Sequence, residues 1–76
     1  MNQIVAGVRG ALVSGRTLKS HTQNLASDIR VGPSESWFEV VIGVDHVMQF
    51  SDPFAAARTF VVYVGDEQAK RAVLQP

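Results

Sequence analysis

Apolar residues near the N-terminus recur at the spacing of a helix. Across residues 3–13, four of them fall on one side of a helical wheel: Ile4, Val8, Ala11 and Leu12. This pattern predicts an amphipathic helix. Two glycines inside the segment weaken that helix by about 1 kcal/mol each relative to alanine, and a glycine-containing strand is the alternative.

Residues 16–30 show a second helical pattern. Leu18, Leu25 and Ile29 lie at positions i, i+7 and i+11, which places them on one face. Gly32 and Pro33 follow, and this pair is typical of the end of a helix. We therefore predict a helix over residues 16–30.

The pattern changes after a polar connector at residues 32–36. Residues 37–42 (WFEVVI) and 46–50 (HVMQF) are aromatic and β-branched or alternate between apolar and polar positions. Both features are typical of strands. With a turn at residues 43–45, they predict a β-hairpin.

Residues 53–74 allow two interpretations. The first is a single helix, which Asp52 would cap and Pro53 would begin. The second is a short turn at 54–57, a strand at 59–64 and a helix at 66–74. We prefer the second, because the apolar residues of TFVVYV (59–64) would point almost all round a helix. In the last helix Asp66 is the expected cap, and Glu67 precedes Arg71 by four residues.

These elements predict one α+β domain spanning residues 1–76. It has an N-terminal helix or helices, a three-stranded antiparallel meander and a C-terminal helix. Helices on one face of the sheet would bury the valines, of which there are twelve. A chain of 76 residues buries only about 60% of its unfolded surface, so a homodimer or a docked protein is an expected way to cover more.

The composition argues against several classes of function. Seven basic and seven acidic residues give a formal net charge of zero, which argues against a general nucleic-acid binder. The longest uninterrupted apolar run, residues 60–64, is far shorter than the roughly 20 residues of a membrane span. No secretory signal is recognisable, so we expect a cytoplasmic protein with no membrane partner.

The charges are segregated along the chain. Residues 9–30 hold four basic residues and one acidic residue, whereas residues 39–67 hold five acidic residues and one basic residue. If the fold keeps these segments apart, the surface has a basic side and an acidic side, and either can steer a partner.

The sequence predicts no catalytic residue, cofactor or metal. It lacks cysteine, and His46 with Asp45 and Asp52 matches no known ligand spacing. No serine lies in a nucleophile elbow. Asp66 and Glu67, the adjacent carboxylates, open a predicted helix, where acidic residues are favoured for structural reasons. We therefore expect a protein that is not an enzyme.

Trp37 is the strongest candidate for a partner contact. It lies where the connector meets the first predicted strand, and tryptophan and arginine are enriched at interface hot spots. The alternative is that Trp37 closes one end of the core. The basic residues of the predicted helix 16–30 are the other partner-binding candidates: Arg16, Lys19 and Arg30.

Nucleic acid is the alternative partner for that basic helix. In such a domain the sheet would stack bases on its aromatic side chains. The candidates are Phe38, Phe50, Phe60 and Tyr63.

The strand pair WFEVVI…HVMQF, followed by Asp52, Pro53 and an alanine run, resembles small accessory proteins of phages and mobile elements, anti-CRISPR proteins among them. The resemblance implies an inhibitor without chemistry of its own that occludes a surface of a larger host complex. Our hypothesis is a non-enzymatic protein-interaction module. A small nucleic-acid-binding domain and an oligomeric ligand-binding or enzyme subunit are the alternatives.

Overall fold

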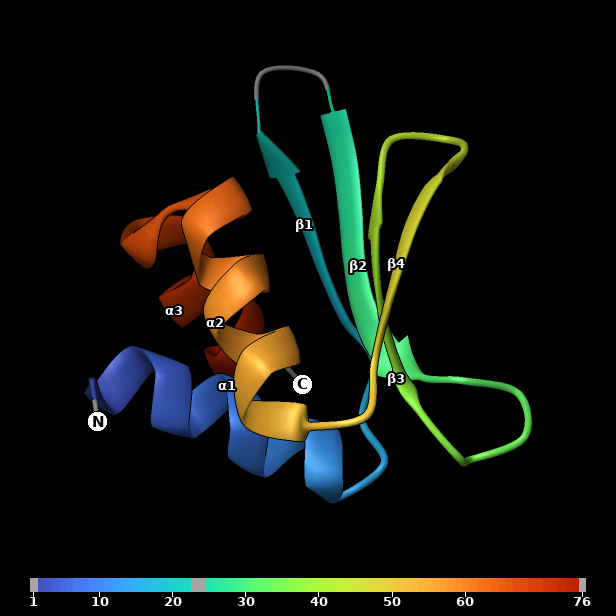
Figure 1. Cartoon of the computed structure of the whole chain (residues 1–76). Coiled ribbons are helices and arrows are strands. Elements are labelled where there is room, and N and C mark those ends of the chain that lie inside the picture. The colour runs from blue at the N-terminus through green and yellow to red at the C-terminus, as the bar shows by residue number, and fades with distance from the viewer. Residues whose placement is uncertain (1, 23–24, 76) are drawn as a thin grey trace.

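Three helices and a four-stranded antiparallel sheet make up the computed structural model, which describes residues 2–22 and 25–75 (Figure 1). In chain order the elements are α1 (Gln3–Val13), β1 (Leu18–Thr22), β2 (Leu25–Val31), β3 (Phe38–Ile42), β4 (His46–Phe50), α2 (Pro53–Val64) and α3 (Asp66–Leu74). The α+β class is thus confirmed. The described residues form one strand and one C-terminal helix more than the sequence predicted.

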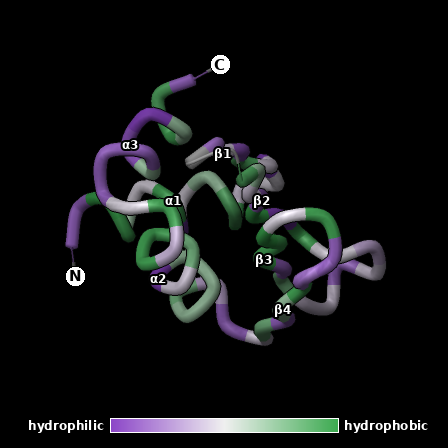
Figure 2. Tube along the Cα trace, turned by 90° about the horizontal axis from the view of Figure 1, so that it is seen from above, coloured by the Kyte–Doolittle hydropathy of each residue, from purple (hydrophilic) through white to green (hydrophobic). Residues whose placement is uncertain are grey.

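The sheet is a simple meander in which each strand pairs with the next, in the order β1-β2-β3-β4. One row of the register joins Leu18, Ile29, Val40 and Met48 across the four strands. The helices all lie on one side of the sheet (Figures 1 and 2). The structure is therefore a two-layer sandwich, and none of the described helices covers the other face of the sheet.

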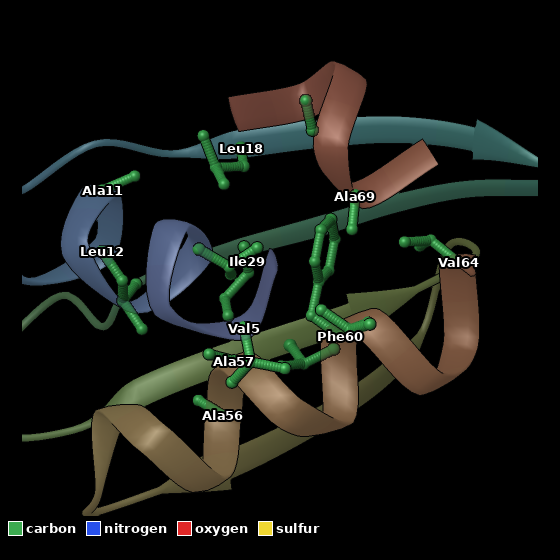
Figure 3. Packing of buried hydrophobic residues seen from close by; sticks show 14 residues of the cluster. Val5, Ala11, Leu12, Leu18, Ile29, Ala56, Ala57, Phe60, Val64 and Ala69 are labelled. Atoms are coloured by element: carbon green, nitrogen blue, oxygen red, sulfur yellow. The ribbon is translucent and has the colours of Figure 1, made fainter. Parts of the chain in front are cut away.

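The core fills the space between these two layers (Figure 3). Leu12 comes from α1, Ile29 from β2 and Phe60 from α2, and all three are fully buried. Small residues on α2 and α3 let these helices approach closely, and Ala56, Ala57 and Ala69 have no exposed surface. The buried valines and alanines thus join the helices to the sheet, as expected for an α+β sandwich.

The predicted helix over residues 16–30 is wrong, because residues 18–22 form β1 and residues 25–30 belong to β2, while residues 23–24 lie outside the described residues. Leu18 and Ser20 are buried, whereas Lys19 and His21, which alternate with them, are exposed. This period of two is that of a strand. Leu18 and Ile29, which the helical prediction placed on one face, are instead direct partners on neighbouring strands.

The preferred interpretation of residues 53–64 is also wrong. They form the helix α2, with Asp52 accepting hydrogen bonds from the backbone N–H groups of Phe54 (3.1 Å) and Ala55 (3.3 Å). The apolar residues do point all round this helix. The structure accommodates them by leaving Val62 76% exposed and Tyr63 51% exposed.

Most of the other local predictions are confirmed. The helix over residues 3–13 is confirmed, and Asn2 caps it. The predicted strands 37–42 and 46–50 are confirmed as β3 and β4 within a residue at each end. Gly65, at a φ of 87°, separates α2 from α3, so residues 53–74 are not a single helix either. The residue expected to cap α3, Asp66, makes no such hydrogen bond.

Candidate functional site

The side of the sheet away from the helices is the candidate site, and we call it the open face. Its side chains alternate with those of the core, as the pleat of a strand requires. They come from all four strands and from the residue just before β3. By register they are Lys19, His21, Ala26, Asp28, Arg30, Trp37, Glu39, Val41, Val47 and Gln49.

Trp37 and Arg30 meet at one carboxylate on this face. The indole Nε1 of Trp37 donates a hydrogen bond to Glu39 Oε2 at 2.8 Å. Arg30 Nε donates to the other oxygen, Oε1, at 3.1 Å. Arg30 also lies 3.7 Å from Asp28 on its own strand. Two residues of β2 and the residue just before β3 thus form one network with Glu39.

Glu39 is covered although it lies on the open face. Its side chain is 8% exposed, compared with 41% for Arg30. Two of the side chains around it, Trp37 and Arg30, donate hydrogen bonds to its carboxylate. Its pKa is lowered, chiefly by the hydrogen bond from Trp37 and further by Arg30, against an opposing effect of desolvation.

The indole of Trp37 lies against the backbone of Gly32. These residues face each other at the end of the sheet, where the Gly32 N–H donates to the Trp37 carbonyl at 2.9 Å. A Cβ at position 32 would lie 2.7 Å from the indole Cε2 and 2.8 Å from Cδ1, which is too close. Glycine at this position therefore allows the indole to lie flat, and Glu39 fixes its rotation.

The other end of the open face has aliphatic side chains on β3 and β4, beside Asp28 and Lys19 on β2 and β1. Val41 and Val47 are direct partners on β3 and β4, and Val47 is 48% exposed. Val44, in the turn just beyond them, is 98% exposed. The open face thus combines an oriented aromatic side chain at one end with exposed valines at the other.

Three of the four predicted partner-binding residues lie on this face: Trp37, Lys19 and Arg30. Arg16 does not. Its guanidinium donates to the carbonyls of Val73 (3.2 Å) and Gln75 (2.8 Å), so it ties the residues before β1 to the end of α3. The basic helix that was to carry these residues does not form, because they belong to strands and a connector.

Sequence reasoning missed Glu39 and Gly32. The signal that could have found Glu39 is its position two residues after Trp37 in a strand, which places both on one face. The condition for a basic and an acidic side, that the fold keeps the two segments apart, is not met at Arg30 and Glu39, which are paired across β2 and β3.

The aromatic residues proposed for base stacking lie elsewhere. Phe60 is fully buried in the core, and Phe38 and Phe50 are partly buried against it. Tyr63 is on α2. Bases could not stack on these side chains from the open face.

The positions considered for chemistry are spread over separate elements. His46 is exposed at the start of β4, where it pairs with Ile42. Glu67 is 3.6 Å from Arg71 on α3. Within residues 2–22 and 25–75, no group of three or more histidine and acidic side chains is placed to hold a metal ion.

Among the described helices, none has both the length and the apolar character needed to cross a membrane.

The chain was compared with models of protein families, with curated protein sequences and with solved structures. It matches none of them.

Proposed function

We propose that the protein is a non-enzymatic protein-interaction module that docks through the open face of its sheet. The observation that carries this proposal is the position of Trp37. Its N–H is satisfied by Glu39 and its ring rests on Gly32, so it loses little rotamer freedom when a partner covers it. Such rigid aromatic side chains are favoured as interface anchors.

The charges of the open face favour a protein rather than a nucleic acid as the binding partner. Arg30 is engaged with Glu39 and Asp28, so it is not free to neutralise a phosphate. Lys19 pairs in register with Asp28. A face whose charges are internally balanced and which ends in exposed valines suits a protein surface.

The partner we propose is a surface of a larger host complex, which the module would inhibit by occlusion. The molecule exposes 4725 Å² in all, so the roughly 800 Å² per partner of a standard interface would take up about a sixth of its surface. The resemblance of residues 37–57 to phage and mobile-element accessory proteins supports inhibition as the outcome of binding.

The test is capture of partners from lysate of the source organism with three forms of the protein. Trp37→Ala should lose the partner that the unaltered protein retains. Tyr63→Ala is the matched control, because Tyr63 is a half-exposed aromatic residue on the helical layer. Circular dichroism checks that both variants stay folded.

Loss of the partner with Tyr63→Ala but not with Trp37→Ala would overturn the open face as the binding site. Capture of nucleic acid alone, with binding that weakens steeply as salt rises, would favour the nucleic-acid alternative. If only the protein itself is recovered, sedimentation would show whether the open face joins two copies or builds an oligomeric ligand-binding subunit.

A further inference from the structure

A groove runs between β1 and α3, along the edge of the sheet, where it borders the open face at Lys19 and His21. Two adjoining hollows of about 250 and 220 Å³ form it, and both are lined by Lys19, Ala72 and Gln75. One wall is the strand at the edge of the sheet and the other is a helix that packs beside it (Figure 2). The groove therefore follows the length of β1.

β1 offers unpaired backbone groups to this groove. The sheet order places it at an edge, paired with β2 alone. Among the residues that the structure describes, no side chain donates to or accepts from the backbone of β1. A free edge of this kind can pair with an extended segment of another protein, which adds a strand to the sheet.

Ser20 is an independent sign that something binds here. It lines the groove and is 6% exposed. Within the described parts of the chain its hydroxyl Oγ is buried without a hydrogen-bond partner. Buried polar groups are nearly always paired, so this hydroxyl is available to a ligand in the groove.

The charge of the groove specifies the ligand. Arg16, Lys19 and Arg71 line it, and none of its lining residues is acidic. Two acids lie beside these cations: Glu67, which is 3.6 Å from Arg71 and 72% exposed, and Asp28, the register partner of Lys19. The residues that line the groove themselves carry a net positive charge on a protein whose formal net charge is zero.

We propose that this groove binds an extended acidic segment of a partner protein. The segment pairs its backbone with β1, places a carboxylate near Arg71, and hydrogen bonds to Ser20. A second copy of the chain fits poorly, because its own β1 (LKSHT) would bring another lysine to the same cations. The proposal does not depend on docking at the open face.

The experiment is selection from a library of random 12-residue peptides displayed on phage, with the unaltered protein as bait. We expect enriched peptides in which aspartate or glutamate alternates with β-branched residues. A synthetic copy of an enriched peptide should shift the backbone amide NMR signals of β1. A selection that enriches nothing, or only peptides without acidic residues, would overturn the proposal.

Two charge reversals on α3 locate the site. Arg71→Glu should weaken binding of the synthetic peptide by about 10-fold or more, because it replaces attraction with repulsion. Lys70→Glu is the matched control on the same helix, since Lys70 does not line the groove, and it should change binding by less than about 2-fold. Equal effects of the two reversals would contradict a specific groove.

Ser20→Ala should have opposite effects on the stability of the protein and on its affinity for the peptide. Removing a buried, unpaired hydroxyl should raise the melting temperature. The same change should weaken binding of the peptide by about 2- to 10-fold, because one hydrogen bond contributes about this much to affinity. Unchanged peptide affinity would show that Ser20 does not belong to the site.

A competition experiment tests the nucleic-acid alternative. Displacement of the peptide by a single-stranded oligonucleotide, with steep salt dependence, would identify a nucleic-acid groove and overturn the proposal.

Discussion

The two faces of the sheet are built from the same strands but are held in different ways. On the helix-covered face Leu18, Ile29 and Val40 form a row that is at most 2% exposed. The open face mixes charged and apolar side chains, and the most buried residue on it is the carboxylate Glu39. Burial on the first face comes from the helices, whereas on the second it comes from neighbouring side chains of the sheet itself.

The two faces therefore contribute differently to the stability of the fold and to the orientation of the Trp37 side chain. Apolar burial contributes about 25 cal/mol per Å² and has no preferred direction. Hydrogen bonds contribute about 0.5–1.5 kcal/mol each but require a defined geometry. The covered face therefore holds the fold together, and the network on the open face sets where Trp37 points.

Two adjacent valines give the largest contrast between the faces. Val40 is fully buried, and Val40→Ala should lower the free energy of unfolding by about 2–3 kcal/mol through lost burial and the cavity left behind. Val41→Ala, on the open face, should lower it by less than about 0.5 kcal/mol. Urea denaturation of both variants measures the difference. Equal losses would mean that the open face is also packed as a core.

Gly32→Ala should have the next largest effect. A methyl group at this position overlaps the indole of Trp37, so the ring must leave the backbone or the strand end must shift. We expect a loss of about 1–2 kcal/mol in unfolding free energy. The emission of Trp37, the tryptophan of the chain, should move to longer wavelength as the ring becomes wetter. An unchanged spectrum would show that the ring does not rest on Gly32.

Glu39→Gln should have the smallest effect, about 1 kcal/mol at neutral pH, because it removes charge from two hydrogen bonds without removing atoms. The pH dependence is more telling. The pKa of Glu39 is lowered in the folded protein, so its contribution to stability is fully present above the ordinary pKa of a glutamate. That contribution is lost as the pH falls through the lowered value.

Denaturation at a series of acidic pH values checks this expectation. The unaltered protein should lose stability more steeply than Glu39→Gln over that range. The emission of Trp37 should titrate with the same midpoint, since its N–H donates to Glu39. Parallel pH profiles for the two proteins would show that the network does not hold the carboxylate in its charged form.

Much of the fold follows from signals within short stretches of the sequence. The helix α1, the hairpin of β3 and β4, the capping role of Asp52 and the break at Gly65 all rest on local patterns. Each depends on the nearest few residues, either through periodicity or through a cap or turn. The choice of Trp37 as a candidate contact also came from its place at a junction, although its function as an anchor is still a proposal.

The tertiary structure alone decided the rest. Residues 16–30 have a helical spacing, but the described strands within them, β1 and β2, form because they pair with neighbouring strands of the sheet. TFVVYV has the composition of a strand, but it forms a helix because α2 can bury Phe60 and Val61 between α1 and the sheet. For such short apolar runs, packing overrides local preference.

Both candidate sites depend on contacts between distant parts of the chain. The network at Glu39 requires the register that sets Arg30 opposite it. The groove joins Lys19 on β1 to Arg71 on α3, two residues that no local pattern relates. The sequence by itself determined which local elements are stable and which residue types are available. Their assembly into an open face and a basic groove depended on strand pairing and helix packing, which are long-range interactions.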